Sequence, residues 1–145
     1  MVITSPKDSV ANSGDGGRDS HAVHCSERLL RSVYFKPYKA CIEEAGTQSV
    51  MAAYNSVNGK PSGVNSWLLM SALRDEWGFE GFVVSDYNLL ATLLPEKHGM
   101  AESPLSVAIL ALSSGLDVDL PSVVEGKGYD LLDRDDVELQ AVESG

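Results

Sequence analysis

A short apolar run that ends on a carboxylate constrains this chain most. Phe82, Val83 and Val84 follow one another without a polar break, and Ser85 and Asp86 come directly after them. Such a run is typical of a parallel strand that is covered on both faces. Because nothing apolar accounts for Asp86, we expect its side chain to project from the carboxyl end of that strand, where barrels and doubly wound sheets place their chemistry. Asp is also a preferred helix N-cap, and capping is the alternative role.

Apolar runs alternate with helical patterns along the chain, which predicts an α/β fold with parallel strands. Strands are expected at Val2–Thr4, Ser49–Tyr54, Gly81–Ser85 and Leu116–Pro121. Helices are expected from Glu27, capped by Ser26, and from Pro37 to Ala45, with Pro37 interrupting the first helix and standing in the first turn of the second. Further helices are expected from Trp67 to Trp77, ended by Gly78, and from Pro104, opened by Ser103, to just before Gly115. The stretch Asn58–Gly63 is predicted to be a turn-rich loop.

The overall charge excludes some classes of partner. The 145 residues carry a net charge of -10, which argues against binding to nucleic acid or to an anionic membrane surface. No apolar run approaches the ~20 residues of a membrane span, and the N-terminus lacks the apolar segment of a signal peptide, so the compartment is left open, with the cytoplasm favoured. The three His residues show no metal-binding spacing, so neither a metal nor another cofactor is expected.

Residues 74–87 resemble a family signature. They read Arg-Asp-Glu-Trp-Gly-Phe-Glu-Gly-Phe-Val-Val-Ser-Asp-Tyr, and this ungapped stretch is similar to the sequence around the catalytic aspartate of glycoside hydrolase family 3, which contains β-glucosidases and β-xylosidases. The resemblance implies that Asp86 is the nucleophile of a retaining glycosidase that hydrolyses terminal β-linked glucose or xylose by double displacement.

The resemblance extends over most of the chain. It includes Thr4–Asn12, Gly16–Asp19, Glu27–Arg31, Phe35–Ala40, Ser49–Asn55 and Gly115–Pro121. It implies that residues 1–122 form a partial (β/α)8 TIM barrel, about strands five to eight, and that residues 123–145 form an acidic tail or a last helix. Since a whole barrel takes ~250 residues, we expect a fragment that is inactive alone and associates with the missing barrel half or with itself. The alternative is a catalytically inactive half-barrel that at most binds sugars or a partner.

The resemblance also implies residues that contact the carbohydrate substrate. These are Tyr54, Met51, Tyr87, Lys7 and Arg18. Tyr54 is expected to hydrogen-bond near the nucleophile, with a buried core tyrosine as the alternative, and ordinary core packing is the alternative for Met51.

Two features of the sequence bear on the remaining carboxylates. The family's usual Lys-His pair reads Lys7-Asp8 here, so an anion that only accepts hydrogen bonds replaces an imidazole. Asp117 and Asp119 flank the last predicted strand, and we expect them to bind locally rather than to act as the general acid/base.

Overall fold

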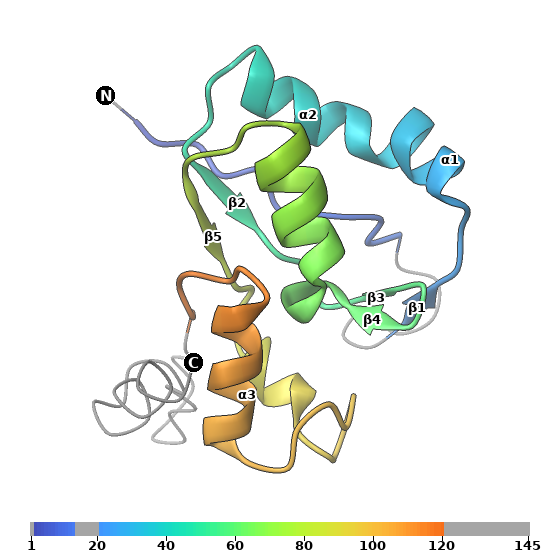
Figure 1. Cartoon of the computed structure of the whole chain (residues 1–145), viewed down its shortest axis with the longest axis vertical. Helices are drawn as coiled ribbons and strands as arrows, with labels where there is room; N and C mark the ends of the chain where they lie inside the picture. The colour runs from blue at the N-terminus through green and yellow to red at the C-terminus, as the bar shows by residue number, and fades with distance from the viewer. Residues whose placement is uncertain (1, 14–20, 121–145) are drawn as a thin grey trace.

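A parallel strand pair forms the centre of the fold (Figure 1). The computed structural model describes residues 2–13 and 21–120. In it β2 (Ser49–Met51) pairs in parallel with β5 (Phe82–Val84), and Val50 lies opposite Val83. Parallel bridges continue this pair on both sides, from Ser9 to Ala52 and from Val84 to Val118. Four segments therefore run side by side in chain order and in one direction, and the α/β prediction is confirmed.

The outer segments differ from the prediction. The expected strand at 2–4 is wrong: Val2 and Ile3 are 87% and 60% exposed, and the backbone pairs with β2 only from Pro6 onward. The expected strand at Leu116–Pro121 is reduced within the described residues to the bridge at Val118. The covering of β5 is also uneven, because Val83 is fully buried whereas Phe82 is 39% exposed.

The first helical region continues through its proline. It consists of α1 (Glu27–Leu29), the π-helical turn η1 (Leu30–Tyr34) and α2 (Phe35–Glu43). Ser26 caps it as predicted, since its hydroxyl oxygen accepts the Leu29 N–H at 3.2 Å. The predicted interruption lies a few residues earlier, at η1, and Pro37 stands in the first turn of a second helix, as predicted. The wide π turn directly before α2, closed by the Phe35 N–H on the Leu30 carbonyl, puts Pro37 in the first turn of α2, where a missing N–H costs little.

The later helices follow their predicted bounds closely. The π-helix η3 (Trp67–Glu76) begins where the Asn65 side chain accepts the Leu68 N–H, and Gly78 follows it with φ +65°. The helix α3 (Pro104–Ser113) is capped by Ser103, whose hydroxyl accepts the Ser106 N–H at 3.2 Å. There are two short 3-10 turns in this part of the described chain: η2 (Ser62–Val64) precedes η3, and η4 (Leu90–Leu93) lies between β5 and α3.

A small second sheet contains a hairpin where a loop was predicted. It orders β1 (Ala22–Val23), β3 (Ser56–Val57) and β4 (Lys60–Pro61), with β1 parallel and β4 antiparallel to β3. The turn residues Asn58 and Gly59 both have positive φ, at 51° and 86°. This is the geometry of a two-residue hairpin turn, which matches the right-handed twist of the flanking strands.

The hydrophobic core joins the helices to the central strands. Phe35 of α2 contacts two tryptophans at ring-centroid distances of 5.8 Å for Trp67 and 5.0 Å for Trp77, which fixes α2 against η3. Val50 and Val83 are fully buried in the paired strands. Each such side chain contributes about 1.5–3 kcal/mol on burial, so the core holds β2 and β5 in a fixed register. No helix within the described ranges is long and apolar enough to cross a membrane.

Candidate active site

Asp86 lies just beyond the carboxyl end of β5, as predicted. The residue is 3% exposed, so its carboxylate is almost completely removed from water. One oxygen, Oδ1, accepts the backbone N–H of Tyr87 at 2.8 Å. The other, Oδ2, forms an ion pair and a hydrogen bond with the ammonium group of Lys7. Both oxygens of this buried carboxylate therefore have partners.

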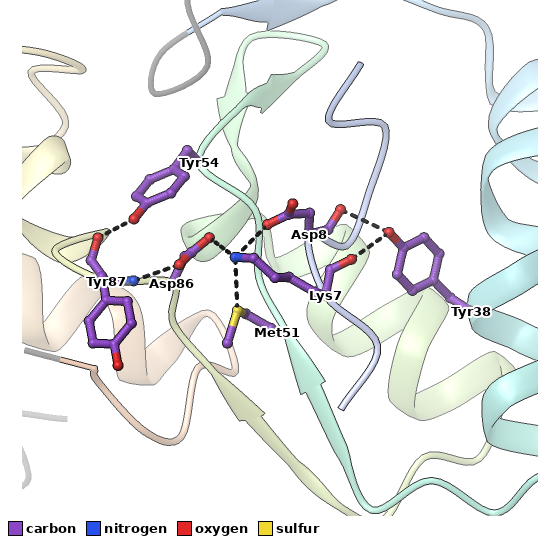
Figure 2. Close-up of polar contacts among 7 residues, drawn as sticks. All are labelled: Lys7, Asp8, Tyr38, Met51, Tyr54, Asp86 and Tyr87. Atoms are coloured by element: carbon purple, nitrogen blue, oxygen red, sulfur yellow. Dashed lines mark hydrogen bonds and ion pairs between the residues drawn. The ribbon is translucent and has the colours of Figure 1, made fainter. Parts of the chain in front are cut away.

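The Lys7 ammonium group connects three side chains (Figure 2). Besides Asp86 it contacts the Asp8 Oδ1 atom at 3.1 Å and the Met51 sulfur at 3.4 Å. The Lys7 side chain is 49% exposed, whereas that of Asp86 is 5% exposed. The cluster thus holds one cation between two carboxylates, and the Lys7 end of it faces water.

A backbone bulge brings Lys7 and Asp8 to the same side. In a strand, consecutive side chains point to opposite faces. Here Met51 donates its N–H to the Pro6 carbonyl at 3.0 Å and accepts the Ser9 N–H at 2.9 Å, which leaves two residues between these bonds where a regular parallel ladder has one. Asp8 takes the left-handed conformation with φ 61°. The extra residue turns both side chains toward Asp86.

Tyr38 supports this bulge from α2, and the sequence analysis did not single it out for this role. Its hydroxyl lies 2.9 Å from the carbonyl oxygens of both Lys7 and Asp8 and donates to them. The contact joins residues about thirty positions apart, so no local sequence pattern predicts it. Burial, and then the negative charge of Asp8, raise the pKa of the Tyr38 phenol, which keeps it a neutral donor.

The protonation states of the ion pair are set by opposing effects. Burial by itself raises the pKa of the Asp86 carboxyl, but the hydrogen bonds from Lys7 and from the Tyr87 N–H outweigh it and bring the pKa below its ordinary value. Desolvation lowers the pKa of Lys7, but its hydrogen bond to Asp86 and its contact with the Asp8 carboxylate bring it above the ordinary value. Both groups are therefore charged near neutral pH.

The two tyrosines near Asp86 have different surroundings. The Tyr54 hydroxyl donates to the backbone carbonyl of Tyr87, the residue that follows Asp86. Tyr54 thereby fixes the backbone that presents the Tyr87 N–H to Asp86 (Figure 2). The Tyr87 ring is 54% exposed. Arg18, the remaining predicted binding residue, lies outside the described residues, as does the tail 123–145.

Asp117 and Asp119 bind locally, as expected. Asp117 accepts the Arg74 guanidinium and the Val83 N–H, both at 2.6 Å. Asp119 accepts the Ser85 hydroxyl at 2.8 Å, and the Ser85 oxygen accepts the Leu120 N–H. These bonds join the segment after α3 to Val83 and Ser85, and so hold in place the backbone that leads to Asp86. Across the ranges 2–13 and 21–120, no three His, Cys, Asp or Glu side chains gather closely enough to hold a metal ion.

Comparisons with known proteins give relatives of one kind. A β-xylosidase of Formosa agariphila is 47% identical over 73% of this chain and 14% of its own length. A periplasmic β-glucosidase of Salmonella typhimurium is 42% identical over 82% of this chain and 15% of its own length. A β-glucosidase structure from Erythrobacter marinus superimposes with a TM-score of 0.84 at 33% identity, covering 100% of this chain and 18% of that one.

The chain thus spans about one seventh of the length of these curated relatives. The sequence model of the family described as "Glycosyl hydrolase family 3 N terminal domain" matches residues 2–140, which is nearly the whole sequence. The chain belongs to the glycosyl hydrolase family 3 N-terminal domain family.

Proposed function

We propose that this chain carries the nucleophile of a retaining β-glycosidase and that the nucleophile is Asp86. One observation carries the proposal: a buried carboxylate follows a parallel strand and is kept ionised by a lysine and a backbone N–H. An ionised carboxylate is what attack on an anomeric carbon requires. The relatives named β-glucosidase and β-xylosidase support terminal β-linked glucose or xylose as the substrate.

The neighbouring side chains suit the binding of a sugar. The Lys7 side chain is half exposed and its ammonium group can donate to sugar hydroxyls, while Met51 beside it offers an apolar contact. The exposed ring of Tyr87 provides a flat surface of the kind that packs against a sugar ring. We assign Tyr54 to positioning the Tyr87 backbone and retain Arg18 as a binding residue by resemblance alone.

We further propose that the chain is a part of a (β/α)8 barrel, about strands five to eight, within residues 1–122. The four parallel segments in chain order support this, because consecutive parallel neighbours are the pattern of that barrel. The general acid that protonates the leaving oxygen would then come from outside these residues, since Asp117 and Asp119 are engaged in local bonds. A chain without that acid should turn over natural glycosides poorly, because the acid contributes ~10²–10⁴-fold.

The test is hydrolysis of aryl β-glucoside and aryl β-xyloside. The chain is assayed alone and co-expressed with the corresponding first barrel half of a β-glucosidase relative, each with an Asp86→Asn control of the same shape. Asp86-dependent hydrolysis in the complemented protein supports the proposal, and full activity of Asp86→Asn contradicts it. If neither preparation hydrolyses either glycoside, the chain is better described as an inactive domain, and its binding of glucose or xylose is then measured by NMR.

A further inference from the structure

We infer that Asp8 is a positioning residue that draws the Lys7 ammonium away from Asp86 and so frees the carboxylate oxygen that attacks. The inference rests on the proposed role of Asp86 as nucleophile. It assigns a function to a residue at which this chain departs from the usual Lys-His pair of its family.

The first step of the argument concerns the two oxygens of Asp86. Oδ1 accepts the Tyr87 N–H, and the backbone there is fixed by the Tyr54 hydroxyl on the Tyr87 carbonyl. Freeing Oδ1 would require the backbone to move. Oδ2 accepts from the Lys7 side chain, which has four rotatable bonds and is half exposed to water. Oδ2 is therefore the oxygen that can be freed for attack.

The second step concerns where the ammonium group can go. A charged ammonium needs a charged or strongly polar acceptor when it leaves a carboxylate in a partly dry site. Besides Asp86, it contacts the Met51 sulfur, which is only a weak acceptor, and Asp8 Oδ1 at 3.1 Å. The Asp8 side chain is 30% exposed, and its Oδ1 accepts no hydrogen bond of good geometry within the described residues. Asp8 can therefore take the ammonium after a small shift.

The third step concerns the backbone, which holds the Asp8 side chain beside the Lys7 ammonium group. The bulge turns Asp8 to the same side as Lys7, and the Tyr38 hydroxyl holds the carbonyls of both residues. An imidazole, whether neutral or protonated, would not attract the ammonium in this way, because it carries no negative charge. The sharing of Lys7 is thus a property of aspartate at position 8.

The test compares Asp8→Asn with Asp8→Glu in the full chain. Asn removes the charge but has nearly the same shape and tolerates the left-handed backbone, so the bulge is kept. Glu restores the charge. The first measurement is NMR titration of the Lys7 side chain, which in Asp8→Asn should lose its proton at lower pH because one of its two anions is gone. An unchanged Lys7 titration would overturn the inference.

The second measurement uses the chain co-expressed with the first barrel half of a β-glucosidase relative. It is the rate at which 2-deoxy-2-fluoro-β-glucosyl fluoride labels Asp86, followed by peptide mass mapping. In this reaction Oδ2 bonds to the anomeric carbon while the carbon–fluorine bond breaks and fluoride leaves with the electron pair, so no general acid is needed. Labelling should slow about twofold to fivefold in Asp8→Asn, the effect of losing one partly solvated charge contact, and recover in Asp8→Glu.

The outcomes separate the two proposals. Equal or faster labelling of Asp8→Asn, with the fold unchanged by circular dichroism, would refute the role of Asp8 and leave Asp86 as the nucleophile. Absence of label on Asp86 in the unaltered chain complemented with the first barrel half would remove the proposed function, and the role of Asp8 with it.

Discussion

Replacing Lys7 with methionine tests the ion pair at the centre of the site. Methionine keeps most of the length of the side chain and removes the charge, so Asp86 would lose the donor to Oδ2 while staying 95% shielded at its side chain. Removing one partner of a buried ion pair costs about 3–5 kcal/mol. Because the Lys7 side chain is 49% exposed and water screens the pair, we expect a smaller loss of about 1–2 kcal/mol in the free energy of unfolding at pH 7.

The pH dependence gives the sharper result. The pKa of Asp86 is lowered in the fold, so its contribution is present above the unfolded-state pKa near 3.8 and is lost as the pH falls through the folded-state value. The pKa of Lys7 is raised, so its contribution is present below 10.5 and is lost as the pH rises through the folded-state value. The stability difference between the two proteins should therefore form a plateau between about pH 4 and pH 10 and shrink at both ends.

Urea denaturation followed by tryptophan fluorescence at pH 3, 7 and 11 measures this difference. Lys39→Met is the control, because Lys39 is also about half exposed and pairs with Glu43 at 3.5 Å on the surface of α2. Its effect should stay below about 0.5 kcal/mol. A difference between Lys7→Met and the unaltered protein that is the same at all three pH values would show that lost packing, rather than the ion pair, causes the change.

Three further predictions concern the support and the edges of the site. Tyr38→Phe should lower the free energy of unfolding by about 0.5–1.5 kcal/mol, because it removes the hydroxyl that bonds the carbonyls of Lys7 and Asp8. Urea denaturation measures this loss, with Tyr34→Phe, a tyrosine in the preceding turn, as the control. Equal effects of the two substitutions would argue against a stabilising role of the Tyr38 hydroxyl. Gly78→Ala should cost about 1 kcal/mol from φ +65° alone, since a Cβ there meets nothing within 4 Å, and a stabilised variant in thermal denaturation would contradict this. The purified chain should self-associate through the outer segments of its central sheet, which sedimentation velocity would disprove by showing a compact monomer.

The elements with strong local signals were predicted from the sequence. Ser26, Ser103 and Gly78 each act within one turn of the chain, by accepting an N–H or by taking a left-handed conformation, and the structure places them as expected. The pairing of β2 with β5 was predictable for a related reason, because two short apolar runs joined by a helix favour a parallel pair. These parts of the fold depend on a few neighbouring residues.

Two features that were not predicted have local causes. Asn58-Gly59 was assigned to a loop, although this dipeptide is the strongest short signal for a hairpin, because the flanking strands of two residues each are too short to show alternation. Pro37 was expected to interrupt the first helix and to lie in the first turn of a second, and it does lie in the first turn of α2; the π turn that precedes α2 was not predicted. In both cases the missing information is backbone geometry over four or five residues.

The site itself was predicted one residue at a time, and its connections were not. Asp86 was identified by its position after an apolar run, but its partner Lys7 is 79 positions away. In a regular strand Lys7 and Asp8 would also point to opposite faces, so the sequence gives no reason to expect that both lie near one carboxylate. The bulge between Pro6 and Ser9 reverses that conclusion. One local signal was present in the sequence, since aspartate is among the few residues that accept positive φ. The replacement of the usual histidine by Asp8 therefore fits the backbone and changes the charge around the nucleophile at the same time.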